Sequence, residues 1–96
     1  MKMDLPTFDG HFHIEDFLDW QSNVEWFFDY MDILEDKKVK LVAYKLIRGA
    51  SAWWEQTRSN RAQQGKTAVQ SWLKMKRMLR AKFLPSNYEQ TVFQQY

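Results

Sequence analysis

Apolar residues recur every three or four positions between Ile14 and Met31, and polar residues fill the positions between them. The apolar positions are Ile14, Phe17, Leu18, Val24, Phe27, Phe28 and Met31. This spacing places them on one stripe of an α-helix. The pattern therefore predicts a first helix from Ile14 to about Tyr30. Acidic side chains near its start favour the same assignment, because the N-terminal end of a helix carries partial positive charge.

The same period returns after a short connection over residues 32–36 and predicts two more helices. The apolar positions of the second helix are Val39, Val42, Ala43, Leu46 and Ile47. Gly49 is expected to end it, because glycine readily adopts the left-handed conformation that follows many helices. A third helix is expected from Ala50 to Gln64, with Gly65 as its stop.

A fourth helix is predicted by the spacing of Trp72, Met75, Leu79 and Phe83, and Pro85 prevents its continuation. Ser86 and Glu89 have the spacing of a capping box, which favours the start of a fifth helix. That helix would be cut off at Tyr96, so we expect the chain to be an excised domain or the front part of a longer protein.

Residues 1–12 show no helical period. Leu5 and Phe8 lie beside Pro6 and Gly10, which favours an extended arm. We therefore predict an all-α fold: a compact orthogonal bundle of four to five short helices over residues 13–96, preceded by an extended N-terminal arm over residues 1–12. The expected core is Phe17, Val24, Phe28, Leu41, Val42, Leu46, Trp53, Trp72, Leu79 and Phe83.

Two adjacent tryptophans, Trp53 and Trp54, cannot both face this core. Neighbouring residues on a helix diverge by about 100°. We expect Trp53 to enter the core and Trp54 to lie at its edge or in a groove.

Composition agrees with a single small domain. Aromatic residues make up 17% of the 96 residues and can supply much of the buried area. The chain has no cysteine, so neither a disulfide nor a thiolate zinc site can stabilise it. No apolar run approaches the roughly 20 residues that cross a bilayer, and no signal peptide is recognisable at the start. We expect a cytoplasmic protein with no membrane partner.

Charge is distributed unevenly along the chain. Residues 1–36 contain ten acids and one lysine, whereas residues 37–82 contain thirteen bases and one acid, Glu55. Acidic and basic helices that lie side by side would partly neutralise each other within the fold. If the two charges stay apart in space, they favour head-to-tail contacts between copies.

Candidate catalytic or metal chemistry is sparse. His11 and His13 stand two residues apart near Asp9, a spacing that could direct two imidazoles toward one metal. No spacing elsewhere indicates a third ligand, so we interpret them as surface or packing histidines. The sequence has no nucleophile elbow and no glycine-rich phosphate loop. We expect no enzyme activity and no cofactor.

Basic side chains on the second and fourth predicted helices permit contact with nucleic acid through phosphate groups. The candidate basic surface consists of Lys37, Lys38, Lys40, Lys74, Arg77 and Arg80. The neighbouring tryptophans have core spacing and are expected to be buried rather than offered to bases. Direct RNA binding therefore stays an alternative.

A series of motifs resembles the Gag capsid domain of gypsy-class LTR retrotransposons over nearly the whole chain. They are Phe8-Asp9-Gly10, Phe17-Leu18-Asp19-Trp20, the helix start over 36–39, residues 46–54 ending in Trp53-Trp54, Ser71-Trp72, and Phe83-Leu84-Pro85. Domesticated relatives such as the neuronal Arc protein are similar over the same stretch. No zinc knuckle and no Asp-Thr/Ser-Gly protease motif is present. RNA would then be packaged only indirectly, through regions outside this sequence.

This resemblance implies the N-terminal lobe of a capsid protein, which assembles with itself into the hexamers and pentamers of a virus-like particle. In the Arc-like relatives the corresponding lobe also binds an extended peptide in an apolar groove. The candidate residues for such a peptide or assembly groove are Phe8, Phe12, Phe17, Trp20, Phe27, Tyr44 and Trp54.

Overall fold

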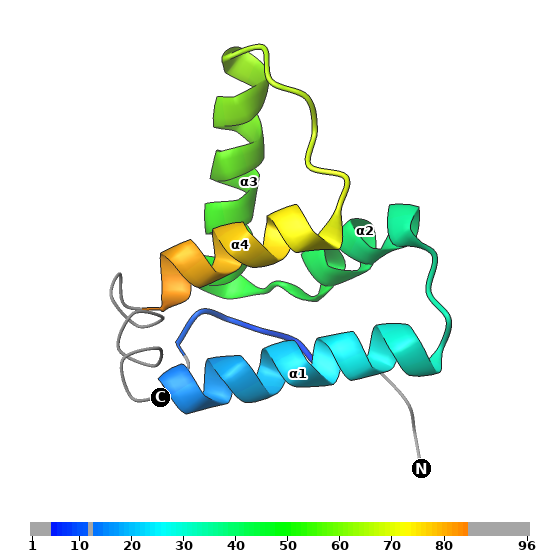
Figure 1. The fold of residues 1–96 in the computed structure, drawn as a ribbon. Coiled ribbons are helices and arrows are strands. Elements are labelled where there is room, and N and C mark those ends of the chain that lie inside the picture. The colour runs from blue at the N-terminus through cyan, green and yellow to red at the C-terminus, as the bar shows by residue number, and fades with distance from the viewer. Residues whose placement is uncertain (1–4, 12, 85–96) are drawn as a thin grey trace, which may run out of the picture.

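Four α-helices form the part of the chain that the computed structural model describes, residues 5–11 and 13–84 (Figure 1). They are α1 (Ile14–Tyr30), α2 (Glu35–Lys45), α3 (Arg48–Gln63) and α4 (Trp72–Phe83). In Figure 1, α1 lies at one end of the molecule, and α3 rises at the opposite end, across the direction of α1 and α4. The predicted all-α fold is confirmed. The fifth helix predicted from Ser86 lies outside the described residues.

The boundaries of α1 and α4 are those that the periodicity predicts. Ser71 precedes α4, and its Oγ accepts a hydrogen bond from the backbone N–H of Lys74 at 3.2 Å. This bond satisfies one of the unpaired N–H groups of the first turn. Gly65, with a φ of 74°, follows α3 at the predicted stop. No helix in the described part of the chain is both long and apolar enough to cross a membrane.

The predicted end of the second helix at Gly49 is wrong. The helix ends at Lys45, and Gly49 lies inside α3. The reason is a long-range pairing that helical periodicity does not reveal. The backbone N–H of Phe8 donates to the Lys45 carbonyl at 3.0 Å, and that of Ile47 donates to the Phe8 carbonyl at 2.9 Å. Phe8 and Leu46 thus form a parallel β-bridge that requires extended backbone.

The N-terminal arm is part of the core. Leu5 and Phe8 are buried. The Phe8 ring stacks on Trp20 with centroids 4.7 Å apart and meets the Phe83 ring edge-on at 4.8 Å. The indole N–H of Trp20 donates to the Pro6 carbonyl at 3.0 Å. The arm therefore joins α1, α4 and the junction between α2 and α3.

Gly10 allows the arm to turn toward α1. Its φ is 91°, and a Cβ at this position would lie 3.1 Å from Cε1 of Phe83. A larger residue would therefore be strained in its backbone and crowded by an aromatic ring.

The buried core differs from the predicted one at several positions. Its members are Leu5, Phe8, Phe17, Trp20, Val24, Phe28, Val39, Val42, Leu46, Ala50, Trp54, Trp72, Met75, Leu79 and Leu84. Leu41, Trp53 and Phe83 were expected inside but are only partly buried against it.

The two adjacent tryptophans take the opposite roles to those expected. Trp54 is 3% exposed and Trp53 is half-buried. Ala50 and Trp54, four residues apart, share the inward face of α3. The backbone N–H of Ala50 donates to the Asp9 carbonyl at 3.2 Å, so the arm helps to orient this face.

Replacing Phe8 should destabilise the whole fold. Phe8→Ala is expected to lower the free energy of unfolding by about 3–5 kcal/mol, because it removes a buried ring that contacts three other aromatic side chains. Phe8→Leu should lower it by less. Urea denaturation followed by tryptophan fluorescence measures both. Tyr44→Ala is the control, since Tyr44 is 79% exposed and its loss should change stability by at most about 0.5 kcal/mol. A Phe8→Ala variant as stable as the control would contradict this role.

Candidate assembly surfaces

Two aromatic side chains on α1 face away from the core. Trp26 follows the buried Phe17 by nine residues, which is about 180° around the helix. Trp26 is 56% exposed and Tyr30 is 63% exposed, and their rings stack with centroids 5.1 Å apart. We call these two residues the aromatic pair. Met31 and Leu34, which follow along the chain, are also exposed large apolar side chains.

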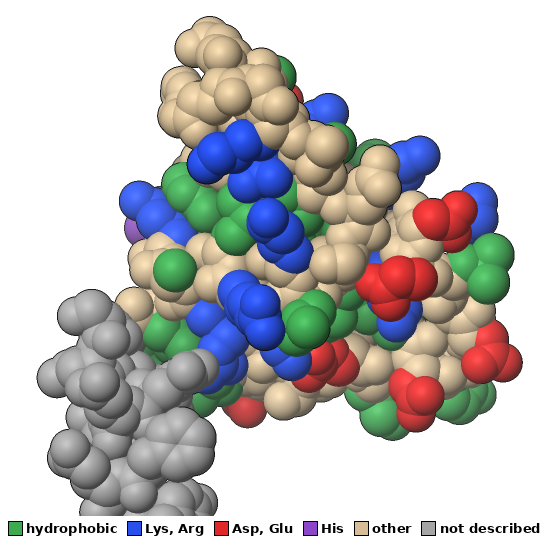
Figure 2. All heavy atoms as spheres, turned by 45° about the horizontal axis from the view of Figure 1, so that its top comes forward, with side chains coloured by type: hydrophobic (Ala, Val, Ile, Leu, Met, Phe, Trp, Pro, Cys, Tyr) green, Lys and Arg blue, Asp and Glu red, His purple; other side chains and the backbone are tan. Residues whose placement is uncertain are grey.

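The charged residues of the helix that carries this pair are all acidic. Helix α1 contains five acids and neither lysine nor arginine, and Asp29 and Asp32 are exposed at its C-terminal end. Helix α4 contains five bases and no acid. On the face drawn in Figure 2, lysine and arginine side chains gather over α3 and α4, and acidic side chains lie toward the α1–α2 turn. Much of the charge segregation along the sequence is therefore retained on the surface.

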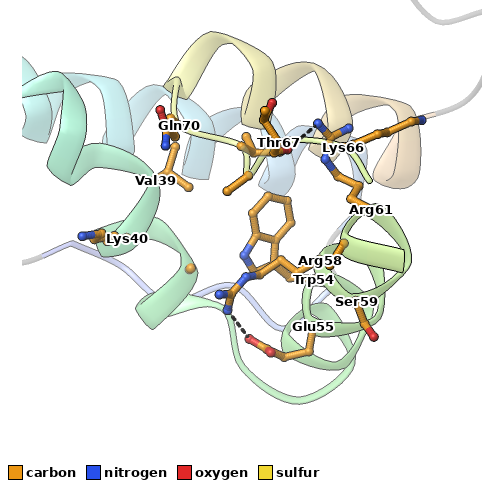
Figure 3. A pocket seen from close by; sticks show the side chains of 14 residues that line it. Val39, Lys40, Trp54, Glu55, Arg58, Ser59, Arg61, Lys66, Thr67 and Gln70 are labelled. Atoms are coloured by element: carbon orange, nitrogen blue, oxygen red, sulfur yellow. Dashed lines mark hydrogen bonds and ion pairs between the residues drawn. The ribbon is translucent and has the colours of Figure 1, made fainter. Parts of the chain in front are cut away.

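A second surface feature lies between α2, α3 and the segment that joins α3 to α4 (Figure 3). It is a hollow of about 690 Å³. We call it the basic hollow, because its lining includes Lys40, Arg58, Arg61 and Lys66 but only one acid, Glu55. Its apolar lining is formed by Val39, Ala43, Trp54, Ala62, Ala68 and Val69.

Both arginines that line the basic hollow have polar partners. Arg58 Nη1 lies 3.2 Å from a Glu55 carboxylate oxygen, and Arg61 Nη2 donates to the Thr67 carbonyl at 2.9 Å. Glu55 and Arg58 are both mainly exposed, so this pair contributes little to stability. The hollow thus keeps a net positive lining beside an apolar wall.

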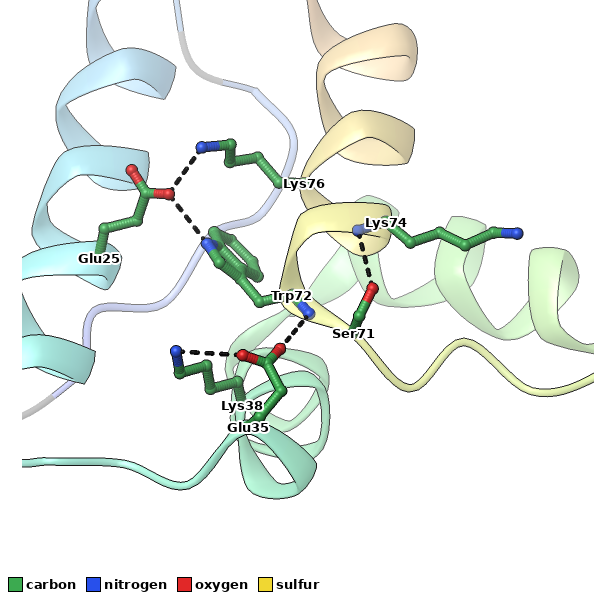
Figure 4. A network of polar contacts seen from close by, with 7 residues as sticks. All are labelled: Glu25, Glu35, Lys38, Ser71, Trp72, Lys74 and Lys76. Carbon is green, nitrogen blue, oxygen red and sulfur yellow. Dashed lines mark hydrogen bonds and ion pairs between the residues drawn. The ribbon is translucent and has the colours of Figure 1, made fainter.

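A polar network at Trp72 joins three helices (Figure 4). The Trp72 indole N–H and the Lys76 ammonium both donate to one Glu25 oxygen, at 3.0 Å and 2.7 Å. The backbone N–H of Trp72 donates to Glu35 at 2.9 Å, and Lys38 lies 3.3 Å from the same carboxylate. Glu25 of the acidic segment therefore neutralises Lys76 of the basic segment within the fold.

These contacts change the acidity of both carboxylates. Partial burial by itself would raise the pKa of Glu25, but hydrogen bonds from Lys76 and Trp72, with the nearby charge of Arg80, hold that pKa below its ordinary value. The pKa of Glu35 is also lowered, first by the hydrogen bond from the Trp72 backbone and then by Lys38.

The residues predicted to line a peptide or assembly groove do not share one open surface. Phe8, Phe17, Trp20 and Trp54 are buried, and Phe27 is half-buried. Tyr44 is exposed on α2, and Phe12 lies outside the described residues. The space between α1 and α4 is occupied by the arm itself. A binding role for these residues stays a prediction.

The residues predicted to form one basic surface are also in different environments. Lys37, Lys40, Lys74 and Arg77 are exposed, and Lys40 lines the basic hollow. Lys38 contacts Glu35 and lies over the Phe28 ring, and Arg80 donates to Gln21. These last two side chains are therefore engaged within the fold.

The histidines considered as metal ligands are exposed. Asp9 accepts a hydrogen bond from the His11 backbone at 2.9 Å and lies 3.8 Å from Arg48. Within residues 5–11 and 13–84, no group of three or more histidine, cysteine or acidic side chains is arranged to hold a metal ion.

The sequence contains a signal for the aromatic pair, although neither residue is among those predicted to line a groove. Trp26 is a large apolar residue off the apolar stripe of α1, and Tyr30 follows it by one helical turn. Two aromatic side chains that face outward do not contribute to the core of a monomer. The basic hollow had no comparable signal, because it depends on how α2 and α3 pack.

Comparison with known families finds a match over most of the chain. Residues 2–84 match the family described as the retrotransposon-derived protein PEG10, N-terminal capsid-like domain. No curated protein and no solved structure matches the chain.

Glu25→Gln should destabilise the protein in a pH-dependent way. Because the pKa of Glu25 is lowered on folding, its stabilising effect is complete above the ordinary carboxylate pKa of about 4.3 and is lost as the pH falls through the lowered value. We expect a loss of about 1 kcal/mol at about pH 7, reduced by the partial exposure of the carboxylate, and almost none at about pH 2. Urea denaturation at both pH values measures the difference.

The matched control for this experiment is Asp19→Asn, which changes an exposed acid of the same helix. Its effect should be smaller at pH 7. An equal loss from both variants at pH 7 would show that helix charge, rather than the Trp72 network, causes the effect.

Proposed function

The chain belongs to the family of retrotransposon-derived PEG10 N-terminal capsid-like domains, and we propose that it assembles with copies of itself into the shell of a virus-like particle. The family assignment gives the domain a structural, capsid-type role. One observation above all supports self-assembly: an aromatic pair is exposed on a helix whose charged residues are all acidic.

The folding of a single copy does not explain why three large apolar side chains near the end of α1 are exposed. Trp26, Tyr30 and Leu34 are each more than half exposed, and the rings of Trp26 and Tyr30 stack on each other. Contiguous exposed apolar surface on a small soluble protein is typical of an interaction site. Tryptophan and tyrosine are also the residues most enriched among those that dominate binding energy.

Charge separation supports contacts between unlike surfaces of two copies. A contact that joins one surface of a subunit to a different surface of the next is heterologous, and it closes into a ring when the rotation allows. Rings of five and six subunits are the proposed units of the shell. Electrostatic complementarity of this kind adds specificity and speed to association rather than large affinity.

Peptide binding remains the alternative function for the space between α1 and α4. The bridge between Phe8 and Leu46 shows that extended backbone fits there, and Leu5 and Phe8 show that apolar side chains fill it. A foreign extended peptide would have to displace the arm. Competition by a synthetic peptide of residues 3–10, read from tryptophan fluorescence, would support this alternative.

Direct RNA binding is the other alternative, supported by the bases of α4. Retention of RNA at low salt, with affinity that falls steeply as salt rises, would support it. If the protein retains no RNA at low salt, this alternative is excluded.

The proposal predicts weak self-association that depends on concentration and salt. Light scattering should show an average mass that rises above the monomer value with protein concentration at about 0.05 M salt. The rise should shrink at about 1 M salt, where the Debye length falls to about 3 Å and surface charges are screened. A mass that stays at the monomer value at every concentration and salt would contradict the proposal.

A further inference from the structure

The two surface features described above are complementary, and we propose that the aromatic pair of one copy docks in the basic hollow of the next. This inference rests on the proposed self-assembly and specifies its contact. The partner is a second copy of this chain, and the contact joins the outer face of α1 to the surface between α2 and α3.

The aromatic pair has the properties of an anchor. Stacking of Trp26 on Tyr30, with 19° between the ring planes, restrains both side chains before any partner arrives. Restrained side chains lose little conformational freedom on binding. The pair therefore presents a large, flat apolar surface at low entropic cost.

The basic hollow has the properties of a receptor for such rings. Arg58 and Lys66 lie beside an apolar wall that includes Trp54 and Val69. Its volume of about 690 Å³ falls within the range of roughly 300–1,000 Å³ that is common for ligand pockets. Arginine and lysine also attract the faces of aromatic rings, most strongly where water is excluded.

Charge at the rims favours the same pairing. Asp29 and Asp32 flank the aromatic pair on a helix that has no lysine or arginine. In the docked arrangement they would face the cationic lining of the hollow. A symmetric contact between the aromatic pairs of two copies would instead bring Asp29 and Asp32 of each copy together, and like charges across an interface oppose association.

The molecule cannot make this contact with itself. The outer face of α1 is directed away from the core at one end, whereas α3 and the segment that follows it lie at the opposite end (Figure 1). Each copy therefore offers one aromatic pair and one hollow to two different neighbours. A chain of such contacts grows head to tail and can close into a ring.

Two double variants test the contact by complementation. Trp26→Ala/Tyr30→Ala removes the aromatic pair, and Arg58→Glu/Lys66→Glu reverses charge in the hollow. Each variant alone should associate about tenfold or more weakly than the natural chain in sedimentation velocity, because each lacks one half of every contact. An equimolar mixture should form a dimer and nothing larger, since only one intact pair and one intact hollow can meet.

Controls separate this result from general effects of mutation. Leu73→Ala removes an exposed large apolar side chain elsewhere, and Lys82→Glu reverses an exposed charge on α4. Both should associate like the natural chain, and circular dichroism should show that every variant is folded.

Distinct outcomes would overturn different parts of the proposal. If the natural chain associates but either double variant associates equally well, or the mixture stays monomeric, the docking contact is wrong and self-assembly stands. If the natural chain itself never associates, the proposed function fails together with the contact.

Discussion

Phe8 packs its ring against Trp20 of α1 and Phe83 of α4, while its backbone pairs with Lys45 and Ile47 on either side of Leu46. One residue of an extended arm thus touches three separate parts of a helical fold. The pairing forces the chain out of helix between α2 and α3, and it fills the space between α1 and α4. The path of α3, and with it the position of the basic hollow, depends on this arrangement.

The Trp72 network secures the other side of the bundle with acids from α1 and α2. The arm packs against the inward faces of the helices, and the Trp72 network pairs some of their charged side chains. The outer face of α1 and the charged residues of the hollow, such as Arg58 and Lys66, are not needed for either. Folding does not require a Trp–Tyr pair on such a face, so these surfaces are available for contacts between copies.

Local periodicity was sufficient to predict α1, α4 and the stop at Gly65, because those boundaries are set by residues within a few positions of one another. It failed at Gly49 and at the choice between Trp53 and Trp54, because both are decided by hydrogen bonds to Phe8 and Asp9, some 40 residues away. The family resemblance gave the capsid-type fold correctly. The groove residues that it implied include Phe8, Phe17 and Trp20, which are buried. They do not include Trp26, which faces solvent.

Site-specific cross-linking tests the head-to-tail account most directly, because the natural chain has no cysteine. Asn23→Cys places a thiol on the exposed side of α1, and Ala62→Cys places one at the basic hollow. A short bis-maleimide should join the two variants to each other in a mixture, and should give little product with either variant alone. Equal or greater cross-linking of Asn23→Cys with itself would show that α1 meets α1, and would contradict the account.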